Sequence, residues 1–334
     1  MSTRLTNLLG TFIRKFAHRI IKRYYPRIQI TGAERIPKTG PVLFCANHPN
    51  SLVDPILIGI AARRPVSFMA KAPLFKTPLL GPIIKALGMV PAYRGRDDAR
   101  QVKKNSASLA LVAKGLKAGR AMGIFPEGVS SDARQLGMVR SGAARIALEA
   151  FDNGVTDLVI IPLGINYDKK EQLGSKVWID VGQPLDLASW IPEHSQDNEE
   201  TIAPSDDKRL RRKLTEELGT ALKSVIVHVD NVDWDPLLTD LETIFKRTKH
   251  KPSDEVPALM RRKRIADAIN YYYGEDPTTA DKIIGNVQSY HRELRSAGLV
   301  IDDPILNRSR TYAIFTFLWQ FGILVLWFLP ALFG

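Results

Sequence analysis

The chain of 334 residues predicts an α/β domain. Short apolar runs alternate with longer stretches of helical periodicity, a pattern typical of strands that are connected by helices. The predicted strands are 42–46, 66–69, 89–91, 122–125, 159–163 and 177–181. The predicted helices between them are 55–62, 78–87, 97–117 and 142–153. Because polar and glycine-containing motifs follow several of these strands, we expect a ligand crevice at the carboxyl ends of the sheet.

The first element, residues 1–31, has the pattern of a basic amphipathic helix. Its apolar residues recur at three- and four-residue steps, Arg and Lys occupy the other face, and no acidic residue precedes Glu34. This composition predicts a helix that lies on anionic headgroups at a membrane interface. Two alternatives stay open, namely a helix that covers the domain core and a cleaved organellar presequence.

Composition changes divide the rest of the chain. The α/β domain is predicted over 32–190, a polar linker over 191–207 and a helical accessory region over 208–308. The segment 311–333 contains no charged residue, and as a helix it reaches on the order of 35 Å, enough for a hydrocarbon core of about 30 Å. We therefore expect one C-terminal transmembrane helix, with a buried core helix as the alternative.

The formal net charge of +12 predicts an anionic partner. No zinc, RNP or helix-turn-helix signature surrounds the basic residues, so we expect no nucleic acid partner and favour membrane lipids. No secretory apolar region is apparent, which predicts a membrane protein with its catalytic domain on the cytoplasmic face. The single cysteine, Cys45, excludes an internal disulfide and lies in a predicted strand, where a small buried side chain is the usual role.

Four short blocks carry the chemistry of the chain. They are Asn47-His48 with Asp54, then 88–94, then 125–128, and finally 161–164. A histidine beside a carboxylate can act as an oriented general base, because the acid fixes the imidazole tautomer and stabilises the imidazolium. Such a base can activate an alcohol. Taken alone, His48 also fits a structural histidine in an Asn-His-Pro turn, so the other three blocks are needed to favour catalysis.

In this order, the four blocks resemble those of the glycerolphosphate and lysophosphatidic acid acyltransferase family, especially its glycerol-3-phosphate acyltransferase-like branch. The resemblance covers about 32–182. It implies a mixed sheet flanked by helices, and transfer of an acyl chain from acyl-CoA or acyl-carrier protein to a hydroxyl of 1-acylglycerol-3-phosphate or glycerol-3-phosphate, in phospholipid biosynthesis. It implies no metal and no cofactor besides the donor substrate.

The resemblance also implies a role for each matching residue. His48 would deprotonate the acceptor hydroxyl and Asp54 would orient His48. Arg94 would bind the acceptor phosphate through its planar guanidinium, while Glu127 and Gly128 would seat the acceptor. The remaining site predictions are an acyl-thioester pocket shaped by Pro162 and additional anion contacts from Lys71 and Arg140.

Two departures from the family pattern keep other functions open. Five residues separate His48 from Asp54, where four are usual, and Val129-Ser130-Ser131 stands where many members have Thr-Arg-Ser. One expected phosphate-binding arginine is therefore missing. The alternatives are an acyltransferase for another lysophospholipid, a catalytically silent membrane-anchored lipid-binding scaffold, and a thioesterase that uses water as the acceptor.

Overall fold

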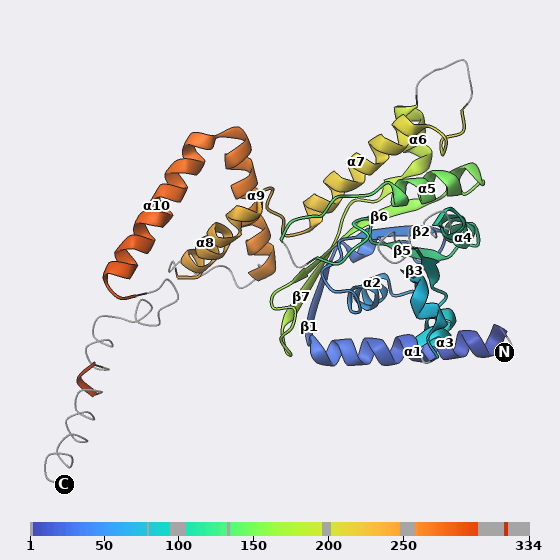
Figure 1. The fold of residues 1–334 in the computed structure, drawn as a ribbon, viewed down its shortest axis with the longest axis horizontal. Coiled ribbons are helices and arrows are strands. Elements are labelled where there is room, and N and C mark those ends of the chain that lie inside the picture. The colour runs from blue at the N-terminus through green and yellow to red at the C-terminus, as the bar shows by residue number, and fades with distance from the viewer. Residues whose placement is uncertain are drawn as a thin grey trace, which may run out of the picture. The chain divides into compact units, whose positions relative to one another are not determined.

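The computed structural model describes residues 3–78, 80–93, 105–131, 134–195, 202–247, 258–299 and 317–319. The chain divides into two compact units, Met1–Val232 and Asp233–Gly334. The first unit contains a β-sheet with helices around it, and the second is helical over its described residues (Figure 1).

The sheet has eight strands within the described residues. In chain order the strands are β1 (Arg27–Thr31), β2 (Val42–Ala46), β3 (Val66–Lys71), β4 (Val90–Ala92), β5 (Ala121–Ile124), β6 (Val159–Tyr167), β7 (Lys176–Val181) and β8 (Leu185–Asp186). Their order across the sheet is β1-β7-β6-β2-β5-β3-β4, with β8 paired to the start of β6.

The pairing is mixed, as predicted. Strands β6, β2, β5, β3 and β4 are mutually parallel, whereas β7 and β8 run antiparallel to β6. The carboxyl ends of the five parallel strands therefore lie along one edge of the sheet. Segments that follow different strands can meet at this edge, as expected for a ligand crevice in an α/β domain.

Helices pack on both faces of the sheet. The helices of the first unit are α1 (Thr3–Tyr24), α2 (Asp54–Ala62), α3 (Leu80–Ala86), α4 (Asn105–Lys117), α5 (Gly142–Asp152), α6 (Leu187–His194) and α7 (Lys208–Val225), with 3-10 turns at Ala33–Arg35, Ala72–Lys76 and Val232–Trp234.

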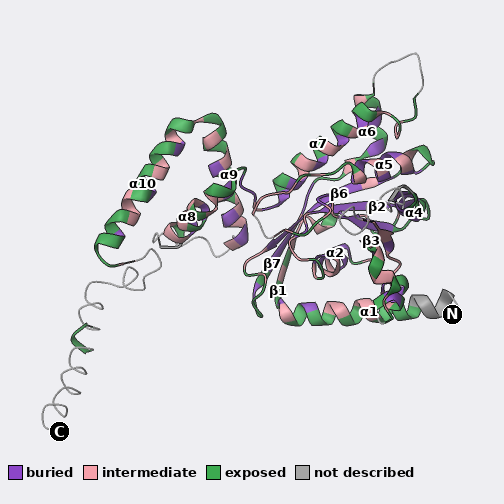
Figure 2. Cartoon of the chain, viewed as in Figure 1, coloured by how far each residue is buried: buried purple, intermediate pink, exposed green. Residues whose placement is uncertain are grey.

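Alternation along the central strand β2 divides the core between the two faces. Leu43 and Cys45 pack in one cluster with residues of α4, α5, α6 and α7, while Phe44 and Ala46 pack in the other with α1 and α2. Every residue of β2 is buried, as Figure 2 shows for this strand. A strand that is buried on both faces is typical of a largely parallel sheet.

Helix α1 packs on the domain through small and polar groups. A Cβ at Gly10 would lie 2.4 Å from the carbonyl oxygen of Ala86, and Arg14 Nη2 donates to the carbonyl oxygen of Leu87 at 2.9 Å. Its large apolar side chains divide between two sides, because Ile21 is buried in the core whereas Phe12 is 68% exposed. The described apolar residues that are exposed on this helix are Leu8, Leu9, Phe12, Phe16 and Ile20. The predicted range 1–31 also contains strand β1, which pairs in parallel with β7.

The second unit contains α8 (Asp235–Arg247), α9 (Ala258–Glu275) and α10 (Pro277–Ser296), and α9 packs against both other helices. A buried ion pair joins α8 to α9, where Arg262 Nε donates to Glu242 Oε2 at 2.7 Å. Helix α7 belongs to the first unit, because Leu210, Leu214 and Leu218 pack in its core. The accessory region predicted at 208–308 therefore spans parts of both units.

The fold prediction was wrong in its C-terminal transmembrane helix. Within the described residues, no helix combines enough length with enough apolar character to cross a bilayer. The predicted segment 311–333 lies outside the described residues, apart from Phe317, Leu318 and Trp319.

Candidate active site

Asn47 positions the first block at the end of β2. Its side-chain Nδ2 donates to the carbonyl oxygen of Ile165 at 3.1 Å, and its Oδ1 accepts from the backbone N–H of Ile165 at 2.8 Å. The amide side chain thereby continues the pairing of β2 with β6, whose last backbone pair is Ala46 with Leu163. These two hydrogen bonds fix the backbone at the point where the chain leaves the sheet, and His48 is the next residue.

His48 and Asp54 are in direct contact. His48 Nδ1 lies 2.9 Å from Asp54 Oδ2, and neither side chain is appreciably exposed. Because an ionised carboxylate only accepts hydrogen bonds, Nδ1 carries the proton and Nε2 carries the lone pair. The imidazole stacks on Phe125, with ring centroids 3.8 Å apart. This arrangement leaves Nε2 as a proton acceptor of defined orientation.

A turn accommodates the additional residue between His48 and Asp54. Asn50 accepts from the backbone N–H of Asp54 at 3.1 Å, and its own N–H donates to Asp54 Oδ2 at 2.7 Å. Helix α2 starts immediately afterwards, with Pro55 in its first turn. The carboxylate of Asp54 thus turns back toward the loop and His48, and Val53 occupies the N-cap position without a side-chain cap.

Tyr167 completes the surroundings of Asp54. Its hydroxyl donates to Asp54 Oδ1 at 2.6 Å. Burial raises the pKa of Asp54 above its ordinary value, while the hydrogen bonds from His48, Tyr167 and Asn50 act in the opposite direction. Burial, and then the charge of Asp54, also raise the pKa of Tyr167 well above its ordinary value, so Tyr167 keeps its proton and remains the donor.

Glu127 holds two backbone N–H groups in place, and its predicted contact with an acceptor stays a prediction. Its Oε1 accepts from the backbone N–H of His48 at 3.0 Å, and its Oε2 accepts from the backbone N–H of Gly137 at 2.8 Å. The side chain is buried and does not line the neighbouring groove. Gly128, with φ of 73°, closes the turn through its N–H to the carbonyl oxygen of Phe125 and does line the groove.

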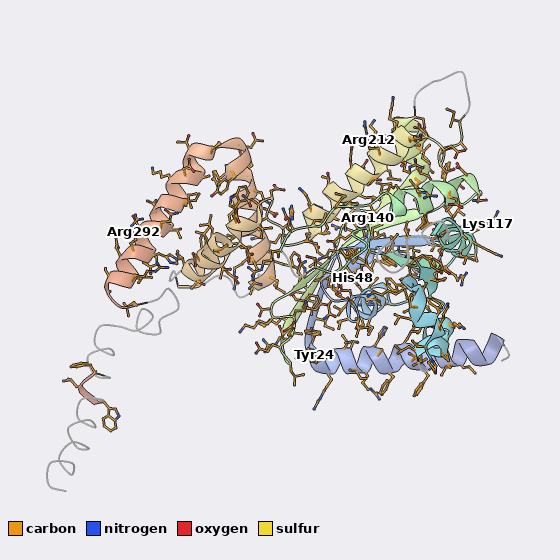
Figure 3. The ribbon with its side chains drawn as sticks, viewed as in Figure 1. Tyr24, His48, Lys117, Arg140, Arg212 and Arg292 are labelled. Carbon is orange, nitrogen blue, oxygen red and sulfur yellow. The ribbon has the colours of Figure 1, made fainter. Side chains whose placement is uncertain are left out.

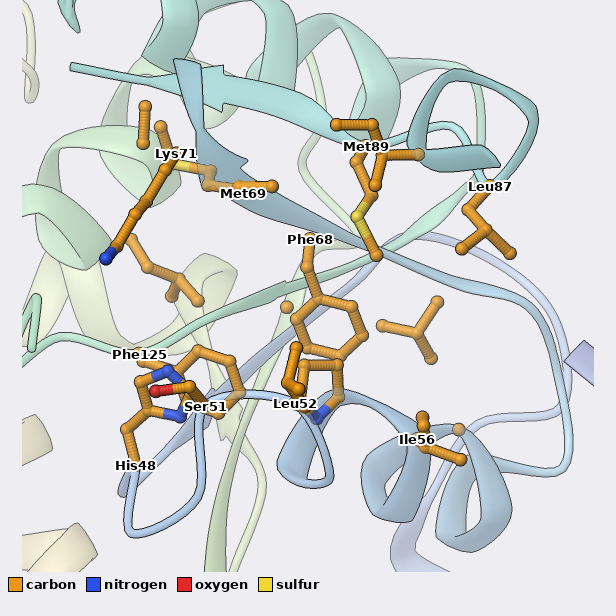
Figure 4. Close-up of a pocket in the computed structure, with 18 of the residues that line it drawn as sticks. His48, Ser51, Leu52, Ile56, Phe68, Met69, Lys71, Leu87, Met89 and Phe125 are labelled. Carbon is orange, nitrogen blue, oxygen red and sulfur yellow. The ribbon is translucent and has the colours of Figure 1, made fainter. Parts of the chain in front are cut away.

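His48 lies at one end of a large groove in the first unit, with a cavity volume of about 1570 Å³. Figure 4 shows His48 and Phe125 at one end of this cavity and Leu87 and Met89 at the other. Its walls come from α1, α2, β3 and the segments after β4 and β5, and they are mainly apolar. Six of the apolar residues that line the groove are Leu52, Ile56, Phe68, Met69, Leu87 and Met89.

Several Lys and Arg residues line the same groove, and three of them are Lys71, Arg140 and Arg145. Lys71 ends β3, Arg140 lies in the segment before α5, and Arg145 lies in the first turns of α5. Figure 3 labels Arg140 and His48 in the first unit. None of the three forms an ion pair with another described residue. The groove therefore offers cationic groups to an anionic ligand. Arg94, the predicted phosphate ligand, lies outside the described residues.

Pro162 does not line this groove, and its predicted part in an acyl-thioester pocket stays a prediction. It lies within β6, opposite Cys45 of β2, and its ring packs against Gly182. Alternation along β6 places it on the face covered by α7, whereas Tyr167 lies on the opposite face. The missing N–H of Pro162 falls where β6 changes its partner from β8 to β7, a position at which proline interrupts little pairing.

Four polar residues at this site were assigned no role from the sequence: Asn47, Ser51, Arg145 and Tyr167. Ser51 Oγ lies 2.6 Å from Ser130 Oγ and so links the first block to the third. A usable signal was present for Tyr167, because a polar residue at the carboxyl end of a long buried strand is expected to lie at the ligand edge of the sheet.

Comparisons with known proteins agree with the motifs. Residues 27–166 match the family model named Acyltransferase. The chain is 25% identical over 179 residues to the 1-acyl-sn-glycerol-3-phosphate acyltransferase of Borreliella burgdorferi, covering 52% of this chain and 66% of that protein. It is 31% identical over 165 residues to a probable 1-acyl-sn-glycerol-3-phosphate acyltransferase of Mycoplasma pneumoniae, covering 48% and 59% respectively. The alignments thus span about two thirds or less of these relatives.

Among solved structures, the chain is similar to the 1-acyl-sn-glycerophosphate (LPA) acyltransferase PlsC of Thermotoga maritima. The identity is 22% and the TM-score 0.45, and the match covers 67% of this chain and 83% of that one. The family model and the two sequence relatives agree with the family predicted from the order of the four blocks. Residues 27–166 therefore carry a domain of the Acyltransferase family.

Proposed function

We propose that this chain transfers an acyl group from an acyl thioester, either acyl-CoA or acyl-carrier protein, to the free hydroxyl of 1-acylglycerol-3-phosphate, with His48 as the general base. The observation that carries the proposal is the hydrogen bond of 2.9 Å from His48 Nδ1 to buried Asp54, at the end of an apolar groove. Only the other nitrogen, Nε2, is left to take a proton from an acceptor.

The reaction follows from this geometry. Nε2 of His48 takes the proton of the acceptor hydroxyl while the hydroxyl oxygen attacks the thioester carbonyl. The tetrahedral intermediate then collapses as the carbon–sulfur bond breaks, and the departing thiolate receives the proton from the imidazolium. Asp54 stabilises the charged imidazolium between these steps. A thioester is already activated toward an alcohol, so the proposed reaction requires no metal.

The size of the groove favours a lipid acceptor over glycerol-3-phosphate. Small-molecule pockets are typically about 300–1,000 Å³, and this groove is larger at about 1570 Å³. Such a volume accommodates two chains, one on the donor and one on the acceptor. Lys71, Arg140 and Arg145 supply cationic groups for a phosphate in the same groove.

A second candidate acceptor is another lysolipid. The observation that favours it is the replacement of the usual arginine in the third block by Ser130, whose hydroxyl is engaged with Ser51. One of the similar proteins is a lyso-ornithine lipid O-acyltransferase of Pseudomonas aeruginosa, 30% identical over 127 residues. Acceptor choice therefore has to be measured directly.

We also propose that the protein binds the cytoplasmic surface of a membrane through α1. Support comes from the exposed apolar side chains of Leu8, Phe12, Phe16 and Ile20, which recur at four-residue steps and point away from the core. Exposed basic residues flank this apolar stripe: Lys15, Arg19, Lys22 and Arg23. An apolar face bordered by cations is the arrangement that binds anionic headgroups.

Purified protein incubated with palmitoyl-CoA and one acceptor at a time, followed by mass spectrometry of the products, tests the reaction. The acceptors are 1-acylglycerol-3-phosphate, glycerol-3-phosphate and lysophosphatidylethanolamine, with a parallel series using palmitoyl-acyl-carrier protein. We expect phosphatidic acid as the main product. Product only from lysophosphatidylethanolamine would support the second candidate. Free palmitate regardless of acceptor would indicate a thioesterase, and no product with either donor would favour a silent scaffold.

Vesicle flotation tests the membrane part separately. We expect the unmodified protein to float with phosphatidylglycerol-containing vesicles, and the double variant Phe12→Ser, Phe16→Ser to bind at least about tenfold more weakly, since two apolar side chains no longer enter the bilayer. Leu111→Ser on α4 is the control, because Leu111 is also exposed but lies outside α1. Equal binding of the double variant would exclude α1 as the membrane contact.

A further inference from the structure

The two oxygens of Asp54 have different hydrogen-bond donors among the described residues. Asp54 Oδ2 accepts from His48 Nδ1 and from the backbone N–H of Asn50, at 2.9 and 2.7 Å. Oδ1 accepts from the hydroxyl of Tyr167 at 2.6 Å. Asp54 is fully buried, so no water shell replaces a lost donor. Removing the hydroxyl of Tyr167 would leave a buried carboxylate oxygen without this partner, which is costly for a charged group.

The position of Tyr167 is fixed by its surroundings. It is the last residue of β6, and its ring packs against the ring of Tyr25 with centroids 5.5 Å apart. The hydroxyl of Tyr25 donates to the carbonyl oxygen of Lys170, and Lys170 Nζ donates to the carbonyl oxygen of Pro49 at 3.1 Å. The ring of Tyr25, and not its hydroxyl, therefore contacts the ring of Tyr167.

We propose that Tyr167 is a positioning residue for acyl transfer, which keeps Asp54 ionised and aimed at His48. The inference rests on the proposed function, because it assigns Tyr167 a part in general-base catalysis. Tyr167 acts through Asp54 and does not touch the groove. The hydroxyl of Tyr167 donates to the carboxylate of Asp54, and the same carboxylate accepts from the imidazole of His48.

The pH dependence that we expect involves the titratable or charged groups found around Asp54 among the described residues. They are His48 on the same loop, Tyr167 at the end of β6, Tyr25 after α1, Lys170 in the loop after β6, and Glu127, which binds the backbone of His48. Only Tyr167 and His48 donate to the carboxylate through side chains. Loss of the tyrosine donor disfavours ionised Asp54, so the His48–Asp54 pair takes up its first proton at higher pH.

The variants Tyr167→Phe and Tyr25→Phe test the proposal as a matched pair, because each removes one hydroxyl from adjacent buried tyrosine rings. For Tyr167→Phe we expect kcat to fall about tenfold with little change in KM, and the acid limb of the kcat/KM profile to move up by roughly one pH unit. For Tyr25→Phe we expect kcat within about twofold of the unmodified protein and an unmoved acid limb, whatever the change in Tm.

A second readout does not depend on turnover. The 15N signals of labelled histidine, assigned to His48 with the His48→Ala variant, are titrated in both phenylalanine variants. We expect the midpoint of the His48 signal to move to higher pH in Tyr167→Phe alone. An unmoved midpoint and acid limb in Tyr167→Phe would overturn the proposal while leaving acyl transfer intact. Absence of any transfer by the unmodified protein would overturn the proposed function, and the titration would still decide whether Tyr167 controls Asp54.

Discussion

The described residues of the first unit include two contacts between a histidine and an aspartate, and only one of them is arranged as a base. His48 and Asp54 lie 2.9 Å apart, and His228 and Asp230 lie 3.1 Å apart. Both imidazoles are buried. The aspartates differ, because the side chain of Asp54 is fully buried and that of Asp230 is 50% exposed.

The decisive difference is what the second ring nitrogen does. His228 Nδ1 accepts from the backbone N–H of Leu136 at 3.0 Å, and its Nε2 faces Asp230, so both nitrogens are occupied. His48 uses Nδ1 for Asp54 and lines the groove. A histidine–aspartate contact therefore indicates general-base catalysis only when the other nitrogen keeps its lone pair and lies beside a cavity.

Substituting the two histidines should give the largest contrast. His48→Ala is expected to lower kcat roughly a thousandfold at nearly unchanged Tm, since it removes the base. His228→Ala is expected to keep kcat within about threefold and to lower Tm, because the backbone N–H of Leu136 loses its acceptor. Steady-state kinetics and calorimetry measure both. Equal losses of kcat in two folded variants would abolish the distinction between the pairs.

A smaller effect tests how the backbone of His48 is held. Glu127→Gln removes one of the two acceptor oxygens used by backbone N–H groups, and a Cβ in Gly137→Ala would lie 2.7 Å from Glu127 Oε2 and displace it. We expect both variants to lower kcat by about ten- to hundredfold with less than about threefold change in KM for the acceptor.

Glu217→Gln is the matched control, because Glu217 accepts from Trp190 Nε1 in the first unit without lining the groove. Its kcat should stay unchanged. A raised KM with normal kcat in Glu127→Gln would instead mean that Glu127 binds the acceptor, as the motif resemblance had implied.

The smallest expected effect is on stability, where the two aspartates should behave with opposite sign. The hydrogen bond from Lys223 holds the pKa of Asp230 below its ordinary value of 3.8. The contribution of Asp230 to the free energy of unfolding is therefore present above pH 3.8, and it is lost as the pH falls through the lower pKa of the folded state. Burial raises the pKa of Asp54. The contribution of Asp54 to the free energy of unfolding is therefore present below pH 3.8, and it is lost as the pH rises through the higher pKa of the folded state.

Melting curves between pH 3 and 7 for Asp230→Asn and Asp54→Asn check these signs. Relative to Asp230→Asn, the unmodified protein should gain Tm as pH rises, by about 2–4 °C at most, since an exposed pair contributes about 1 kcal/mol or less. Relative to Asp54→Asn, it should lose Tm over the range above pH 3.8. Parallel trends for the two variants would show that burial does not govern Asp54.

Much of the fold could be predicted because its central strands are apolar runs with clear ends. Strands β2, β3, β5 and β6 were predicted within a few residues, and so were helices α2 and α5. Strand β1 was missed, since its alternating sequence from Arg27 continues the basic N-terminal pattern and it joins the sheet only by pairing with β7. Helix α8 was missed as well, and the predicted transmembrane helix was wrong.

At the site, the order of the motifs in the sequence identified which segments meet. It did not identify every contact that the side chains of these segments make. Glu127 was expected to face the acceptor, yet it accepts from two backbone N–H groups. Pro162 was expected near the thioester, yet its place in the alternation of β6 puts it on the face under α7. A shift of one residue along a strand changes the face on which a side chain lies, and motif spacing alone does not fix that register.

The sequence by itself determined the acyltransferase domain at residues 27–166, the α/β class, the order of the four blocks and the separation of His48 from Asp54, because these depend on local pattern and residue identity. Only the tertiary structure decided which nitrogen of which histidine is left as a proton acceptor, and that Tyr167, 113 residues along the chain from Asp54, donates to its carboxylate. Parallel strands bring distant segments to one edge of a sheet, and the contacts made there depend on register, burial and hydrogen-bond geometry.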